Sequence, residues 1–365
     1  MGQIYDQIYA QLRTTWTPEG QQFLPIAHAL LHYQRLNLYR RVTLHDRNLL
    51  FKFCNTIIAS ESKPQALGEM VKKLLVWGLD KSTEESAEKE MDQLLRSMLP
   101  HLIHLKSLFL RAPSIARSVL NSFTTTPPPS SLVSLDLKLD DPALIDLILP
   151  LFPSLQHLVV HVVASAVNKP TADRIPLHPP RRLKTLEIFS GYRDHATLDL
   201  IASTEATETI LNGPHTHLGL ACVRNSDVMT GLSVDWNNPW WDFDREAESL
   251  SHLLSKLSNL TKLTLHGVGR THVGNHFFTD YFKSDLQLQS LCLCQRFELN
   301  TADLIHAFQT KPITLKSLVL DLDGRDEQDS ENPWPGIGIE GIAAVIKVYS
   351  EGGVEVSGSV FELLR

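Results

Sequence analysis

The chain has 365 residues, of which 43% are hydrophobic and 21% charged, as in folded rather than disordered proteins. Its formal net charge of -7 gives no general attraction to phosphates or to an anionic membrane surface, which disfavours nucleic acid and membranes as partners. The four cysteines form no CxxC pair, so we expect no disulfide framework and a reducing compartment, cytoplasmic or nuclear.

The first 44 residues predict a small helical module that ends in a strand. Apolar residues recur every four positions at Ile4, Ile8 and Leu12, and Tyr5 and Tyr9 accompany them. A second apolar helix follows Pro18 and Gly20 and contains Leu24, Ala27, Leu31 and Leu38. Helices this short cannot bury all of these side chains among themselves, so we expect the surplus to contact the rest of the chain or a partner. Residues 42–44, Val-Thr-Leu, predict the first, edge strand of a sheet.

One pattern recurs along the rest of the chain: leucine, two variable residues, leucine, one variable residue, then Leu, Ile or Val. It occurs at 104–110, 131–137, 154–160, 182–188, 259–265, 286–293 and 314–320. This is the strand signature of a leucine-rich repeat. The gap between Leu183 and Leu260 is long enough to contain one or two degenerate units, which we expect around 217–223 and 231–236. Further units are expected at 71–79 and 352–358.

Helical signals lie between these strands. Asp141 is suited to the N-cap of a helix, Pro142 to its first position, and Pro153 to its end. A similar helix is expected between Asn300 and Pro312. Within each strand, alternation predicts that side chains such as Leu108 and Leu110 point inward. The same alternation predicts that Ser107, Phe109 and Arg111 point outward.

We therefore predict an α/β fold. Residues 45–365 form an irregular leucine-rich-repeat solenoid, with parallel strands on one face and helices on the other, because one repeat cannot bury its leucines without neighbours. Residues 1–44 form the small helical module, and a plain cap that covers the first repeat is an alternative role for it.

The order of these features resembles F-box proteins with degenerate leucine-rich repeats, a type abundant in fungi. The resemblance matches Ile4, Ile8 and Leu12 to the first F-box helix and Leu24, Ala27 and Leu31 to the second, with residues 38–40 at its end. It implies that the module docks on a Skp-type adaptor through Ile4, Tyr5, Ile8, Tyr9, Leu12, Leu24, Leu31 and Leu38. The family's Leu-Pro-x-Glu opening would fall before Met1, so we expect either residues further upstream or weakened docking.

The candidate target-binding residues are outward-facing or lie in two loops that share Asn-Pro-Trp, at 235–246 and 330–338. Tryptophans beside acidic residues in Pro-containing loops offer rigid aromatic anchors, although they also serve to fill gaps in an irregular repeat. The candidates are Phe109, Glu187, Phe189, Trp236, Trp240, Trp241 and Trp334.

Spacing favours neither a metal site nor a catalytic site. His266, His272 and His276 lack a cysteine or carboxylate at ligand spacing, so we expect no metal and a solvated loop over 266–276. Cys292 and Cys294 point the same way from one strand, and we expect exposed structural cysteines there. No Ser-His-Asp, Cys-His or paired-carboxylate arrangement is evident, so we expect no enzyme and no cofactor.

The resemblance implies a substrate-recognition subunit of a Skp-cullin-F-box ubiquitin ligase, which binds an unknown target protein through its repeats. The alternative is a leucine-rich-repeat scaffold that binds partners without an adaptor.

Overall fold

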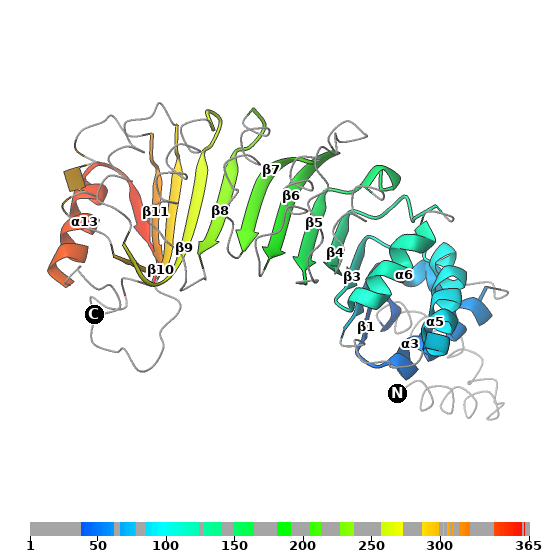
Figure 1. Cartoon of the computed structure of the whole chain (residues 1–365). Helices are drawn as coiled ribbons and strands as arrows, with labels where there is room; N and C mark the ends of the chain where they lie inside the picture. Colours follow the sequence, from blue (N-terminus) through cyan, green and yellow to red (C-terminus); the bar gives the residue numbers. More distant parts are fainter. Residues whose placement is uncertain are drawn as a thin grey trace, which may run out of the picture. The chain divides into compact units, whose positions relative to one another are not determined.

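The computed structural model describes residues 38–61, 66–77, 85–123, 127–139, 149–163, 181–190, 204–212, 227–236, 257–272, 287–298, 302, 305–306, 309, 314–321, 339–359 and 361. The chain forms two compact units. Unit 1 comprises residues 1–137 and 151–154, and unit 2 comprises residues 138–150 and 155–365. Figure 1 labels most of the helices and strands of both units, and each unit is described separately.

The strands of unit 1 are parallel and follow chain order. They are β1 (Arg41–Leu44), β2 (Lys73–Val76), β3 (Ser107–Leu110) and the first part of β4 (Ser134–Leu139). In β3 the side chains alternate between buried and half-buried, with Leu108 and Leu110 inside, as predicted. Leucines from adjacent strands are in register, for example Leu74, Leu108 and Leu135. The expected edge strand at 42–44 and the expected unit at 71–79 are both confirmed.

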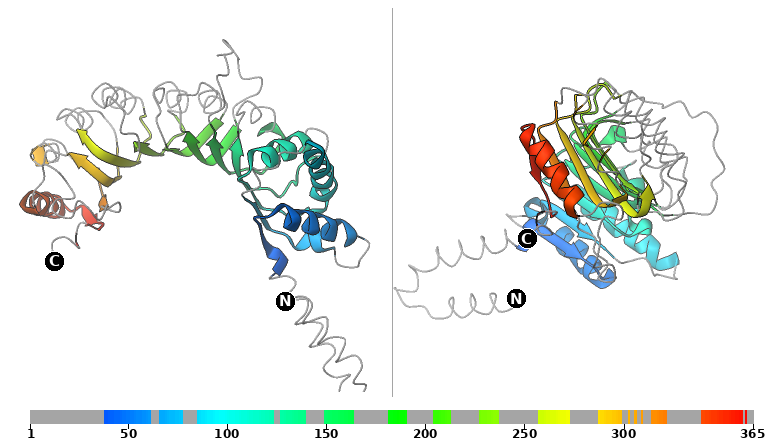
Figure 2. Two further views of the ribbon diagram at one scale, coloured as in Figure 1. Left: turned by 60° about the horizontal axis from the view of Figure 1, so that its bottom comes forward. Right: turned by 90° about the vertical axis from the view of Figure 1, so that its left-hand side faces the viewer.

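Helices cover one side of these strands. They are α3 (Arg47–Ala59), α4 (Leu67–Met70), α5 (Glu85–Met98) and α6 (Pro113–Phe123), with the short 3-10 helix η1 (Leu99–His101) after α5. Helices α3, α5 and α6 pack side by side in that order, and α6 contacts β3 (Figure 2). In α3 the buried residues recur at helical spacing, at Leu50, Phe53, Cys54 and Ile57. One face of this helix therefore completes the core of unit 1.

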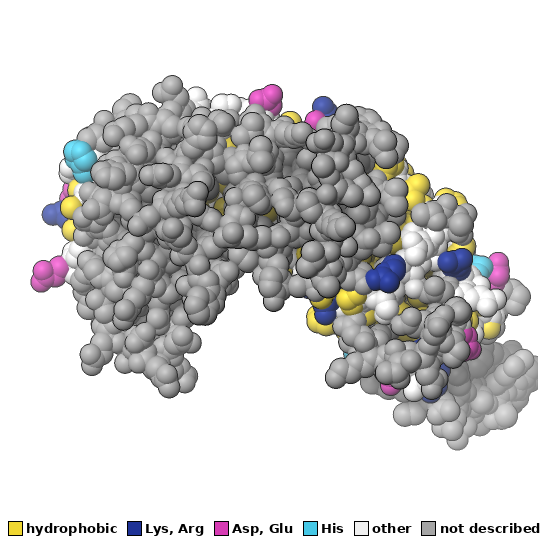
Figure 3. Space-filling model, in the orientation of Figure 1, with side chains coloured by type: hydrophobic (Ala, Val, Ile, Leu, Met, Phe, Trp, Pro, Cys, Tyr) yellow, Lys and Arg dark blue, Asp and Glu magenta, His cyan; other side chains and the backbone are white. Residues whose placement is uncertain are grey.

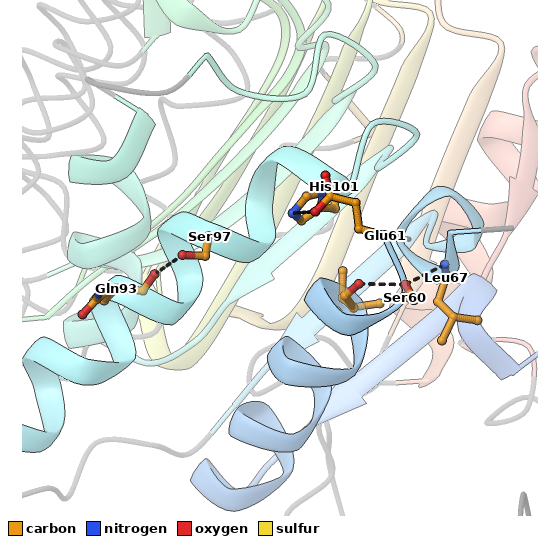
Figure 4. A network of polar contacts seen from close by, with 7 residues as sticks. Ser60, Glu61, Leu67, Gln93, Ser97 and His101 are labelled. Carbon is orange, nitrogen blue, oxygen red and sulfur yellow. Dashed lines mark hydrogen bonds and ion pairs between the residues drawn. The ribbon is translucent and has the colours of Figure 1, made fainter. Parts of the chain in front are cut away.

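Polar side chains define both ends of α3. The Asp46 carboxylate accepts a hydrogen bond from the backbone N–H of Asn48 at 2.6 Å and caps the start. At the other end, the buried Ser60 hydroxyl donates to the Ile57 carbonyl at 2.7 Å and accepts from the Leu67 N–H at 3.0 Å (Figure 4). Ser60 thus ties the end of α3 to the start of α4 and leaves none of these buried polar groups unpaired.

Unit 2 is a run of parallel strands, again in chain order. They are β5 (His157–Val162), β6 (Arg181–Ser190), β7 (Thr204–Asn212), β8 (Gly231–Trp236), β9 (Lys262–His272), β10 (Ser290–Glu298), β11 (Ser317–Asp321) and β12 (Glu355–Ser357), with the 3-10 helix η2 (Leu149–Leu151) before β5. Two rows of side chains run across β5 to β11 and are at most 2% exposed: Leu158, Leu186, Thr209, Leu232, Leu263, Leu291, Leu318, and Val160, Ile188, Leu211, Val234, Leu265, Leu293, Leu320. These rows are the core of a leucine-rich-repeat-like solenoid.

Two strands occupy the long gap in the sequence pattern. The expected unit at 231–236 is confirmed as β8, whereas the one expected at 217–223 lies outside the described residues. Strand β7 was not predicted, because Ala206 and Thr209 occupy the two core positions at which the pattern requires leucine, and only Leu211 fits it. The register with β6 nevertheless places these three residues opposite the core residues Leu183, Leu186 and Ile188. Backbone pairing therefore preserves a repeat whose side chains have diverged.

The predicted loop over 266–276 is wrong as far as His272. Strand β9 continues to that residue and pairs with β10, with a register irregularity between Gln295 and Phe297. The loop was expected only because the three histidines lack metal-ligand spacing, and that argument does not bear on the backbone, whose hydrogen bonds alone form the ladder.

The C-terminal end of unit 2 combines a helix and a short strand. Helix α13 (Ile339–Glu351) contacts β12, which confirms the repeat unit expected at 352–358. Gly353, two residues after the end of the helix, has a φ of +81°, and the Gly353 and Val354 N–H groups donate hydrogen bonds to the Ser350 and Tyr349 carbonyls. This Schellman arrangement suits glycine and turns the chain directly into β12.

The predicted inter-repeat helices are described in part. Ala302, Ile305, His306 and Gln309 are helical, as expected between Asn300 and Pro312. Most of the helix expected from Asp141 lies outside the described residues. Within the described part of the chain, none of the helices is both long and apolar enough to cross a membrane.

Candidate protein-binding surface

The outward side of unit 1 brings aromatic and basic side chains together. Lys73 on β2 and Phe109 on β3 both point outward, and the Lys73 Nζ lies 4.3 Å from the centroid of the Phe109 ring. A cation over an aromatic face is attracted by the ring quadrupole. Phe109 is half-buried and so remains available for contact, as the sequence predicts for this residue.

An ion pair lies beside this aromatic ring. The Arg111 Nη2 is 2.6 Å from the Asp136 Oδ2, and register places Asp136 directly opposite Phe109. The Asp136 side chain is 4% exposed and that of Arg111 is 32% exposed. A buried carboxylate therefore holds a guanidinium that still reaches solvent, and the charge-assisted bond fixes its direction.

A tryptophan completes the surface. Trp77 follows β2, and its backbone N–H bonds to the Leu44 carbonyl at 2.9 Å, which continues the ladder beyond the strand. The residue is 47% exposed. Strand alternation places Trp77 on the same side as Lys73, four residues further along the chain. We call Lys73, Trp77, Phe109, Arg111 and Asp136 the unit 1 face.

The two units differ in charge. Residues 1–137 and 151–154 contain 15 Lys and Arg against 12 Asp and Glu, a net +3, whereas the rest of the chain has 19 against 29, a net -10. At the starting edge of the unit 1 strands, partial burial and then the nearby charges of Lys106 and Arg40 lower the pKa of Lys72. Figure 3 shows further basic side chains among hydrophobic ones in the region of α5 and α6. Unit 1 is therefore a basic part of an acidic protein.

In unit 2 the predicted contact residues Glu187 and Phe189 lie outward on β6 and are half-buried. The Glu187 Oε1 accepts a hydrogen bond from the Asn212 Nδ2 at 3.1 Å. The Phe189 ring stacks on that of His161, with centroids 4.0 Å apart and planes 10° apart. Neighbouring strands thus hold both side chains in defined orientations.

The two cysteines of β10 depart from the expectation of exposed thiols. Cys294 is 8% exposed and Cys292 is half-buried, and their sulfur atoms are 3.2 Å apart. A hydrogen bond from the Cys294 thiol lowers the pKa of Cys292. The described residues contain no group of three or more His, Cys, Asp and Glu side chains suited to a metal ion.

The other predicted site residues are placed as follows. Leu38 is 62% exposed and lies in the helical residues 38–40 that precede β1. Trp236 belongs to β8, but its side chain is outside the described part. The remaining candidates lie outside the described residues: Ile4, Tyr5, Ile8, Tyr9, Leu12, Leu24, Leu31, Trp240, Trp241 and Trp334. Lys73 and Trp77 were missed, although alternation through 71–79 would have placed both beside Phe109.

Comparison with known proteins gives no family: no family model and no curated protein matches the chain. Among solved structures, the chain is similar to a crystal structure of a protein from Bacteroides fragilis, with 13% identity and a TM-score of 0.38. The match covers 84% of this chain and 69% of that one. The functional proposal therefore depends on this chain's own residues.

Proposed function

We propose that this chain is a receptor that binds another protein through the outward side of its repeats, without catalysing a reaction. The observation that carries the proposal is the unit 1 face, where Trp77 and Phe109 lie beside the ion-paired Arg111. Aromatic side chains, tryptophan above all, and arginine side chains contribute most of the binding energy in protein interfaces when their orientation is fixed. The buried leucine rows behind them supply that rigidity.

The charge of unit 1 indicates the kind of target. The unit carries a net +3 in a chain of -7, and its outward Lys73 and Arg111 are basic. A target segment with carboxylates next to an apolar side chain would pair with Arg111 and cover Trp77. Such charge complementarity accelerates association and selects against basic partners.

We further propose that the N-terminal segment links the receptor to a Skp-type adaptor, and through it to a cullin ubiquitin ligase. The resemblance at Ile4, Ile8 and Leu12 supports this, as does Leu38, an exposed apolar residue where the second F-box helix would end. The receptor's contribution would be geometric, because tethering raises the effective concentration of the target near the transferring machinery.

The adaptor link is tested by co-purification of the full chain with a Skp adaptor. Binding by the wild type, and its loss in Ile8→Asp and Leu12→Asp, would support the link. Ala10→Asp is the matched control, because it places the same charge on the opposite side of the predicted helix. If the wild-type chain fails to bind any Skp adaptor, the adaptor link is refuted and the scaffold alternative stands.

The target-binding face is tested separately by comparing the proteins captured from cells by the wild type and by variants. Trp77→Ala with Arg111→Ala should lose a set of partners that Ser134→Ala, an outward substitution further along the same rows, retains. Equal capture by all three proteins would refute the role of the unit 1 face while leaving the adaptor test unaffected.

A further inference from the structure

Strand β10 presents two thiols on one side, in an arrangement that the receptor role does not require. Cys292 and Cys294 are two residues apart, so the strand directs both side chains outward. Their sulfur atoms lie 3.2 Å apart, within the hydrogen-bond range for thiols. Cys292 is half-buried, whereas Cys294 is 8% exposed. The pair thus has one sulfur that reagents can reach and, beside it, a second sulfur that is buried.

The neighbouring strands supply the charged groups around this pair. On β9, Lys262 lies near Cys292 and His266 is the register partner of Cys294; on β11, Asp321 is the register partner of Cys294. The hydrogen bond from Cys294 lowers the pKa of Cys292 most, and Lys262 lowers it further, against burial and Asp321. The thiolate, which is the reactive form of cysteine, therefore forms more readily at Cys292.

We propose that Cys292 and Cys294 are a peroxide-sensitive thiol pair that closes reversibly into a disulfide within β10. The Cys292 thiolate attacks one oxygen of hydrogen peroxide, so that an S–O bond forms, the O–O bond breaks and Cys292 becomes a sulfenic acid. The departing hydroxide takes up a proton and becomes water. The Cys294 sulfur then attacks the Cys292 sulfenic acid. The S–S bond forms, the S–O bond breaks, and the hydroxide leaves with the Cys294 proton as a second water. Two thiols lose two electrons in total, and one peroxide gains them.

The strand can accommodate this bond. Residues two apart in a strand have Cα atoms about 6.7 Å apart, which is near the upper end of the range for disulfides. The sulfur atoms must approach from 3.2 Å to about 2.05 Å, so the pleat has to tighten slightly. The pairing of β9 with β10 already shifts between Gln295 and Phe297, directly after the pair. Cys292 and Cys294 are still in register with both β9 and β11, so the tightening has to be absorbed at the end of this regular stretch. A disulfide near its geometric limit is readily reduced again.

The test uses the full chain, reduced and then exposed to hydrogen peroxide. After denaturation and alkylation, trypsin releases residues 284–296, which contain these two cysteines and no other. We expect this peptide to lose both alkyl groups and to be lighter by about 2 Da than the reduced peptide, and dithiothreitol to restore double alkylation. Cys54 is the internal control: it is fully buried and its raised pKa, about 12, should keep it reduced.

Single variants assign the order of the two steps. Cys294→Ser should trap sulfenic acid at Cys292, detected as a dimedone adduct, whereas Cys292→Ser should reduce dimedone labelling of this peptide by about tenfold or more. Three results would overturn the proposal: a wild-type peptide that stays doubly alkylated, a bond that joins two chains, or faster labelling in Cys292→Ser than in Cys294→Ser. The wild-type result decides the main point even if a variant folds poorly.

Discussion

Leu108→Ala and its neighbour Phe109→Ala should differ sharply in their effect on stability. Leu108 is 0% exposed and in register with Leu74 and Leu135, so shortening it leaves a cavity between three strands and the helices behind them. Buried leucine-to-alanine substitutions cost about 3 kcal/mol. Phe109 faces outward, and its replacement should cost about 1 kcal/mol, mostly through the lost contact with the Lys73 ammonium.

Urea unfolding followed by circular dichroism measures both costs. With a slope of about 2 kcal/mol per M, Leu108→Ala should lower the midpoint of the unit 1 transition by about 1.5 M and Phe109→Ala by about 0.5 M. Leu108→Met, which keeps the volume, should stay close to wild type. Equal midpoints for the two alanine variants would refute the assignment of inward and outward rows, and with it the unit 1 face.

Three further substitutions test local features of the structure. Gly353→Ala should cost about 1 kcal/mol of unfolding free energy in urea, because the φ of +81° is unfavourable for a residue with a Cβ, whereas the control Gly352→Ala should change little. Thr209→Val should raise the unfolding free energy by about 1 kcal/mol, since the Thr209 hydroxyl is buried in a leucine row and has no hydrogen-bond partner among the described residues; a loss of stability would contradict this. Burial raises the pKa of Cys54 from 9.0 to about 12, so between pH 9 and 12 the unfolded chain is ionised there while the folded one is not. The free energy of unfolding should therefore fall by about 1.4 kcal/mol per pH unit between pH 9 and 12, and the contribution of Cys54 to stability should be fully present below pH 9. Cys54→Ala should remove this part of the slope, and equal slopes in both proteins would contradict the prediction.

The strands of the solenoid could be predicted because a buried row demands the same residue type at the same place in every repeat. Leucines of β3, β9, β10 and β11 therefore recur in the sequence at the positions where they align in space. Strand β7 could not be found in this way, because Ala206 and Thr209 fill core positions without resembling leucine. The extension of β9 to His272 was missed because the leucine pattern stops at Leu265, whereas the backbone pairing with β10 continues beyond it.

For the candidate site, the sequence could predict only which side chains point outward. Alternation places Phe109, Glu187 and Phe189 outward, and the structure confirms all three. Their contacts depend on rotamers across strands that are far apart in the chain, such as Glu187 with Asn212 or Phe189 with His161. Side-chain patterns do not contain that information. The sequence places Cys292 and Cys294 on the same side of one strand, but the 3.2 Å approach of their sulfur atoms likewise depends on the rotamers of the two side chains.

Inward side chains form the core and outward side chains form the surface, which explains how such a chain can keep its fold while its binding partner changes. The inward rows are at most 2% exposed across β5 to β11, so substitutions there create cavities or unpaired buried polar groups. Outward rows contain Lys, Glu, Thr, Ser and Cys at equivalent places, and only adjacent strands constrain them. Arg111 with Asp136 and Phe189 with His161 are such local pairs, each formed between neighbouring strands. Because each pair depends on its own two strands, a new pair can arise without disturbing the leucine rows, and the outward surface can diverge faster than the core that supports it.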